Sequence, residues 1–169
     1  MHFRWWSNLV ADSSQATGLK WATAAGGGKV LQVVSATYST ETSVTGSTWT
    51  DSGLSLSITP SASTSRILVM ISQLIYAERS SDNAGVGLRL LRGATTVMTV
   101  SNSYATYVNI ASGSTPQSGG TGVIVYVDSP ATTSSTTYKT QFQASFSSVT
   151  AKAQIASGTS TITLLEIGA

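Results

Sequence analysis

The chain has no cysteine and only one histidine among its 169 residues. Without cysteine, disulfides and thiolate metal sites are excluded, so stability has to come from packing, hydrogen bonds and association with other chains. The histidine, His2, lies at the start of the chain, away from the segments that build a core. A Ser-His-Asp or Cys-His catalytic constellation therefore cannot form within the main domain.

Charged residues are also scarce. Nine Lys/Arg and seven Asp/Glu make up 9% of the chain, against about 25% in a typical soluble domain. The basic residues are dispersed singly, whereas phosphate recognition needs clustered cations, so we predict no nucleic-acid partner. No run approaches the roughly 18 uncharged apolar residues of a membrane span, and we expect no membrane insertion. The first residues lack the apolar core of a signal peptide, which predicts synthesis in a cytoplasm.

The few acidic residues stand far apart in the sequence, and this spacing does not predict a catalytic carboxylate pair. The segment 78–83 offers oxygen ligands for Ca²⁺, but it lacks the dense alternation of acids that such loops carry. The glycines of segment 113–122 are followed by no Gly-Lys-Ser/Thr ending, which excludes a phosphate-binding loop. We predict no catalytic residue, no metal and no cofactor, and we interpret segment 113–122 as a long mobile loop.

Serine and threonine supply most of the polarity, with 29 and 25 residues. Residues 54–59 and 138–146 alternate apolar and polar side chains, the pattern of a strand with one buried face. Other segments are apolar on both faces, which indicates strands that are central in a sandwich or that press against another subunit. These segments are 67–76, 86–91, 123–127 and 162–167.

Turn signals separate about eight or nine such strands. We therefore predict an all-β fold, an antiparallel β-sandwich of jelly-roll-like type with an extended N-terminal tail. Residues 1–28 hold three of the four tryptophans and end in three glycines, so we interpret them as a docking tail and linker. Residues 29–169 form the sandwich, or knob, domain.

Two groups of side chains are candidates for binding. Phe3, Trp5, Trp6 and Trp21 have no local core to enter, which favours docking to a partner or to their own oligomer. Tyr104, Tyr107 and Asn109 lie among small polar residues and are candidates to face a receptor, since tyrosine offers a large contact area at low entropic cost.

Four segments resemble bacteriophage tail-fibre and head-fibre proteins, especially those of marine and cyanobacterial phages. They are residues 9–23 (LVADSSQATGLKWAT), 26–34 (GGGKVLQVV), 49–60 (WTDSGLSLSITP) and 65–69 (SRILV). In such proteins the first segment precedes a Gly-rich linker and a terminal β domain. One departure is that tail fibres usually carry an N-terminal adaptor domain, whereas Met1 here stands a few residues before the motif.

The resemblance implies a bacteriophage virion structural protein: a short homotrimeric fibre or knob, without cofactor or catalytic residues. It would be attached by its N-terminal tail to capsid, portal or tail subunits, and would bind a host-surface glycan or protein. The alternatives are a decoration protein that stabilises the capsid or tail and, least favoured, a glycan depolymerase. Each alternative locates the protein in the virion.

Overall fold

The computed structural model describes residues 7–23, 29–80, 83–110 and 115–168. Within these ranges the chain forms β-strands and one short 3-10 helix, which confirms the predicted all-β class. No described helix is long and apolar enough to cross a membrane. The elements are β1 (Ser7–Ala11), β2 (Leu19–Thr23), β3 (Val30–Tyr38), β4 (Thr42–Thr45), β5 (Thr50–Ile58), β6 (Arg66–Glu78), β7 (Asn83–Arg92), β8 (Thr95–Asn109), β9 (Gln117–Asp128), β10 (Thr136–Ala144), β11 (Thr150–Ala153), the 3-10 helix η1 (Ile155–Ser157) and β12 (Ser160–Ile167).

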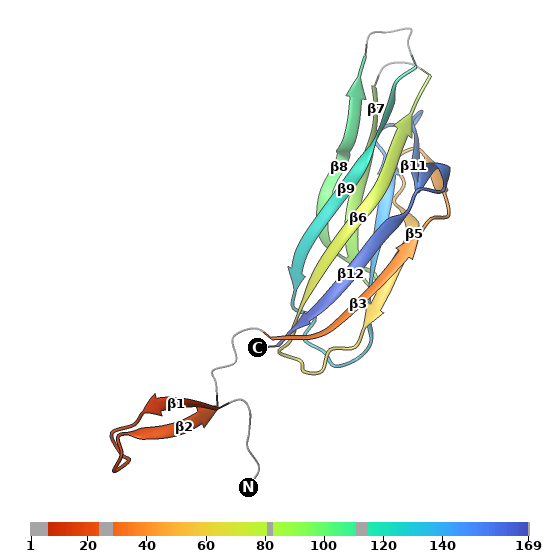
Figure 1. Cartoon of the computed structure of the whole chain (residues 1–169). Coiled ribbons are helices and arrows are strands. Elements are labelled where there is room, and N and C mark those ends of the chain that lie inside the picture. Colours follow the sequence, from red (N-terminus) through yellow and green to blue (C-terminus); the bar gives the residue numbers. More distant parts are fainter. Residues whose placement is uncertain (1–6, 24–28, 81–82, 111–114, 169) are drawn as a thin grey trace.

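Two antiparallel sheets pack face to face (Figure 1). The four-stranded sheet has the order β5-β10-β7-β8, and the larger sheet is built around the long strand β6. On one side of β6, β12 pairs with its first half and β11 with its second half, while β9 pairs along the other side. In turn, β3 pairs with β12 and β4 pairs with β11. The strands β3 and β4 therefore act together as one interrupted strand, and β11 and β12 act together as another.

Counting each interrupted pair as one strand, the described part of the sandwich has eight strands. The sheets then have the orders first–eighth–third–sixth and second–seventh–fourth–fifth. Consecutive strands lie in opposite sheets, except the fourth and fifth, which are neighbours in the same sheet. This order contains the two Greek-key connections of a jelly roll. The predicted jelly-roll-like sandwich is confirmed.

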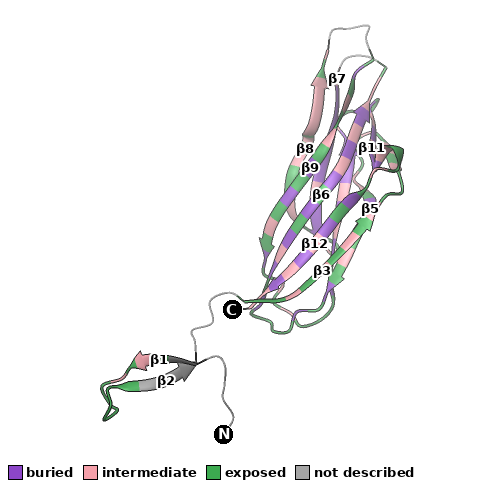
Figure 2. Ribbon diagram, viewed as in Figure 1, coloured by how far each residue is buried: buried purple, intermediate pink, exposed green. Residues whose placement is uncertain are grey.

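The core lies between the sheets because apolar side chains alternate with exposed ones along the strands. Figure 2 shows this alternation along β6, β9 and β12. The prediction that residues 67–76 form a strand is confirmed. The largest fully buried apolar side chains are Leu54, Ile67, Ile75, Leu88, Leu90, Ile124, Tyr138, Phe142, Ile162 and Leu164.

A buried hydrogen-bond network crosses this core from sheet to sheet. The Thr140 hydroxyl (β10) donates to Gln73 Oε1 (β6) at 2.7 Å and lies 2.6 Å from the Ser52 hydroxyl (β5). Gln73 Nε2 donates to Ser160 Oγ (β12) at 3.1 Å. Since buried polar groups are costly when unpaired, this network fixes one alignment of the two sheets.

Glu166 joins the end of β12 to the turn after β5. Its fully buried carboxylate accepts hydrogen bonds from the backbone N–H and hydroxyl of Ser61, at 2.7 and 2.6 Å, and from Gln32 Nε2 at 2.6 Å. Burial alone would raise the pKa of Glu166, but these donors outweigh it and lower the pKa from 4.5 to about 2. The carboxylate is therefore ionised in the folded protein at neutral pH.

Three parts of the chain differ from the sequence-based expectation. The expected extended tail contains an antiparallel hairpin, β1–β2, whose turn is closed by a hydrogen bond from the Asp12 N–H to the Gly18 carbonyl. Residues 95–109, which no strand pattern marked, form β8. The predicted mobile loop 113–122 is also wrong in part, because residues 117–122 belong to β9 and pair with β6; residues 113–114 lie outside the described residues.

Candidate recognition surface

The outer face of the four-stranded sheet carries a bulge in β8. The pairing of β7 with β8 shifts between Val86↔Thr106 and Leu88↔Ser101, so residues 102–105 stand opposite Gly87 alone. Val86 and Leu88 point into the core, so Gly87 and its neighbour in alternation, Gly85, face outward.

These two glycines let the bulge lie flat on the sheet. A Cβ atom at Gly87 would clash with the backbone carbonyl of Asn102, and one at Gly85 would clash with the carbonyl of Ser103. Two hydrogen bonds hold the bulge in this place: Gln143 Nε2 donates to the Asn102 carbonyl at 2.8 Å, and Ser101 Oγ accepts from the Tyr104 N–H at 2.7 Å. Bulges that redirect side chains are common beside functional sites.

The bulge presents an aromatic pair. Tyr104 is 66% exposed, and its ring meets that of Tyr107 edge to face, with centroids 4.8 Å apart and an interplanar angle of 70°. Asn109 lies two residues beyond Tyr107, exposed on the same face of β8. All three receptor-facing candidates thus share one face, and the structure brings Tyr104 and Tyr107 into contact.

Next to the bulge lies a row of polar side chains that sequence reasoning did not identify as a site. Gln141 (β10) connects two neighbours: its Oε1 accepts from Arg89 Nε at 2.9 Å, and its Nε2 donates to Asp51 Oδ1 at 2.7 Å. Lys139 Nζ lies 2.7 Å from Asp51 Oδ2. The Arg89 guanidinium stacks over the Trp49 ring, 4.3 Å from its centroid.

The electrostatics of this row follow from the contacts. Burial acts to raise the pKa of Asp51, but hydrogen bonds from Lys139 and Gln141 and the nearby positive charges lower it overall. Asp51 therefore stays charged and holds the neighbouring amide and ammonium groups in fixed positions. The alternation of residues 138–146 places Lys139, Gln141 and Gln143 on the outer face of the sheet, where the bulge buries Gln143, but their partners come from strands distant in sequence.

The whole surface combines the exposed ring of Tyr104 and the half-buried rings of Tyr107 and Trp49 with oriented amide, guanidinium and carboxylate groups on the sheet. This combination suits non-covalent recognition of a ligand that offers both hydroxyl or amide groups and apolar patches. Among the described residues, no group of three or more His, Asp and Glu side chains could hold a metal. The described part of segment 78–83 carries the ion pair of Glu78 with Lys152, at 2.9 Å; Asp82 lies outside the described residues.

The proposed docking residues are mostly outside the described part of the chain. Phe3, Trp5 and Trp6 precede it, and Trp21 lies in β2, where its backbone pairs with Leu9. The hairpin contains exposed Leu9 and Leu19. The docking role of this segment stays a prediction.

Comparison with known protein families gives no match, and no curated protein sequence matches the chain. Among solved structures, it is similar to "Structure of infectious bursal disease virus Gx strain", with 12% identity and a TM-score of 0.39. That alignment covers 90% of this chain and 39% of the viral one. A second similar structure, of T=1 particles derived from the same virus, shows 12% identity and a TM-score of 0.34, covering 94% of this chain and 42% of that chain. The chain thus spans about two fifths of these proteins, and the proposals below rest on its own residues.

Proposed function

We propose that this chain is a bacteriophage virion structural protein, a short trimeric fibre or knob that attaches the particle to its host. The observation that carries the attachment role is the β8 bulge, which holds Tyr104 out from a rigid sheet beside the polar row of Arg89, Gln141 and Asp51. The sequence resemblance to phage fibre proteins supports the virion location.

The ligand in this proposal is a glycan or a protein on the host surface. An aromatic ring beside planar hydrogen-bonding groups can pack against the apolar face of a sugar ring while the amides contact its hydroxyls, and it can equally pack against a protein loop. Loops and bulges on a rigid scaffold are where binding residues gather, because the scaffold keeps their geometry fixed.

The test is Tyr104→Ala on the assembled particle. Tyr104 is largely exposed, so the fold should be retained, while loss of a binding hot spot should lower host adsorption about tenfold or more. Ser55→Ala is the matched control, since Ser55 is exposed on the same sheet but lies on β5, away from the bulge. Equal adsorption of both variants, with weakened particles after deletion of the protein, would replace this role with decoration of the capsid or tail.

Residues 1–28 are proposed as the element that docks the protein to the virion. Aromatic side chains at the start of the chain would bury on the order of 150–250 Å² each in a partner's pocket. Deletion of these residues should leave a folded β domain that no longer binds particles lacking the protein. Normal decoration of particles by the truncated chain would exclude the docking role.

A further inference from the structure

The outer face of the larger sheet is apolar and uncovered. On β9, Val123 and Val125 are 61% and 59% exposed, and neighbouring strands add Met70 and Val33 at 44% and 57%. The registers align these side chains into rows across four strands. One row is Val33–Leu165–Leu68–Val127 and the next is Ser35–Thr163–Met70–Val125.

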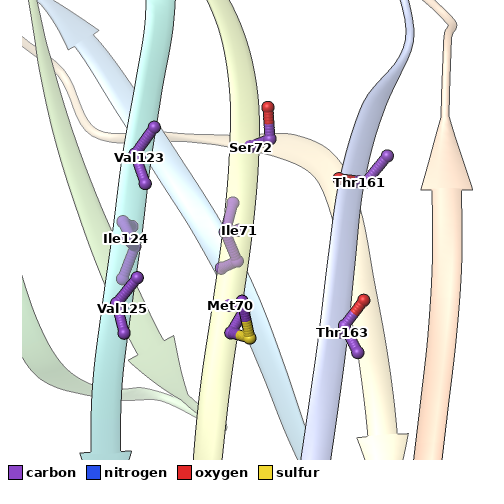
Figure 3. Close-up of a pocket in the computed structure, with 8 residues that line it drawn as sticks. All are labelled: Met70, Ile71, Ser72, Val123, Ile124, Val125, Thr161 and Thr163. Carbon is purple, nitrogen blue, oxygen red and sulfur yellow. The ribbon is translucent and has the colours of Figure 1, made fainter.

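A shallow hollow lies in the middle of this face. Figure 3 shows Met70, Ser72, Val123, Val125, Thr161 and Thr163 around it, on β6, β9 and β12, with Ile71 and Ile124 pointing to the other side of the sheet. Its volume is about 230 Å³, below the roughly 300–1,000 Å³ of small-molecule sites. A hollow of this size and lining fits apolar side chains of another protein surface.

We infer that a second copy of this chain covers this face, in the oligomer that the proposed function already assumes. Charge supports this occupant. Between Arg66 at one end of β6 and the Glu78–Lys152 ion pair at the other, the described outward side chains of the sheet are apolar or hydroxyl-bearing. Such a face can meet its own copy without like-charge repulsion and without desolvating a charge.

The area of this face approaches what an interface needs. Strands about 4.8 Å apart, with about 3.3 Å per residue, give four strands of seven residues a flat area of roughly 450 Å². Projecting side chains enlarge the accessible surface beyond that value, toward the roughly 800 Å² that each partner buries in a standard interface. An uncovered apolar patch of this order is at the upper end for a monomer.

The edge strand β9 gives an independent reason for cover. It is twelve residues long, and residues 117–127 contain no charged residue and no proline. Edge strands of monomers are usually protected by such residues, since an unprotected edge pairs with other chains. The strand β9 also carries the most exposed valines of the face. Association with a second copy would therefore cover both the edge of β9 and the apolar face.

The chain's lack of cysteine allows a direct test by a single introduced thiol. Val125→Cys, oxidised in the purified full chain, should give disulfide-linked dimers on non-reducing gels at micromolar concentration. In the proposed trimer the three covered faces converge on the three-fold axis, where the thiols of two copies can meet. Ser55→Cys, on the outer face of the other sheet, is the matched control and should remain mostly unlinked. Equal cross-linking of the two variants, or none at Val125→Cys, would overturn the inference.

A second variant measures the oligomer itself. Light scattering of the unmodified chain should give a multiple of 17.5 kDa, three copies in the proposed trimer, and Val125→Glu should give 17.5 kDa while circular dichroism stays unchanged. Ser55→Glu should keep the oligomeric mass. A monomeric unmodified chain, or an oligomer that survives Val125→Glu, would overturn the inference, and in either case the effect of Tyr104→Ala on adsorption tests the attachment role separately.

Discussion

Gly87 lies directly under the backbone carbonyl of Asn102, so close that a single added methyl group would clash with it. The β8 bulge, and with it the position of Tyr104, depends on this approach of two backbones. A residue without a side chain on β7 therefore controls which side chain β8 presents to solvent.

Gly87→Ala should consequently destabilise the protein by about 1–3 kcal/mol, because the bulge has to move to make room for the methyl group. Denaturant midpoints measure the change. Gly120→Ala on β9 is the control, since nothing lies within 4 Å of a Cβ there and its φ is not positive; it should be neutral or slightly stabilising. Equal midpoints for both variants would show that the bulge does not need the close approach.

Thr140→Val should cost about 1–3 kcal/mol, although the two side chains have nearly the same shape. The change removes the hydroxyl that donates to Gln73 Oε1 and leaves a buried acceptor poorly paired. Thr137→Val is the same substitution on the same strand, but at an exposed position, and should stay within about 0.5 kcal/mol. Chemical unfolding of both variants compares them, and a smaller loss for Thr140→Val than for Thr137→Val would contradict a structural role of the network.

The stability of the protein should depend on the ionisation of Glu166. Its pKa in the folded chain, about 2, lies below the ordinary 4.5, so the folded state favours the charged form. Glu166 therefore stabilises the protein fully above about pH 4.5, and this contribution disappears as the pH falls from 4.5 through 2. The free energy of unfolding should show a gap between the unmodified chain and Glu166→Gln at pH 7 that narrows over this window.

The control for that experiment is Glu41→Gln. Glu41 is exposed and accepts one hydrogen bond, from the Ala156 N–H. The difference in the free energy of unfolding between Glu41→Gln and the unmodified chain should be small at all pH values. A gap for Glu166→Gln that is constant between pH 7 and pH 2 would mean that the three hydrogen bonds to the carboxylate do not lower its pKa.

The sandwich could be predicted from the sequence because its signal is local. Alternation in residues 54–59 and 138–146, and the apolar run 67–76, identify β5, β10 and β6 without knowledge of their neighbours, although residues 145–146 lie past the end of β10. The sequence did not predict β8, because its bulge breaks the two-residue period and its side chains are half-buried or exposed. Glycines 119, 120 and 122 suggested a loop, whereas the backbone of β9 is held by its long pairing with β6.

The recognition surface could be predicted only in part. Tyr104 and Tyr107 stand close together in the sequence, and their small polar neighbours indicate exposure. The polar row needs Asp51, Arg89 and Gln141 from three strands. A strand register between residues 52 and 90 positions apart cannot be obtained from composition or periodicity. The uncovered face of the larger sheet could not be predicted either. For strands that are apolar on both faces, periodicity does not distinguish a strand buried within the sandwich from one whose outer face is uncovered.

The pairing of β3 with β12 has a mechanical consequence. β3 begins immediately after the linker, and it runs antiparallel to β12 over eight paired positions. If residues 1–28 attach the protein to the particle while a host ligand binds the opposite sheet, a pulling force on the particle would act on the sandwich through β3. The hydrogen bonds between β3 and β12 would then be loaded together, in shear, instead of being opened one after another, and an adsorbed particle would resist being pulled away by flow.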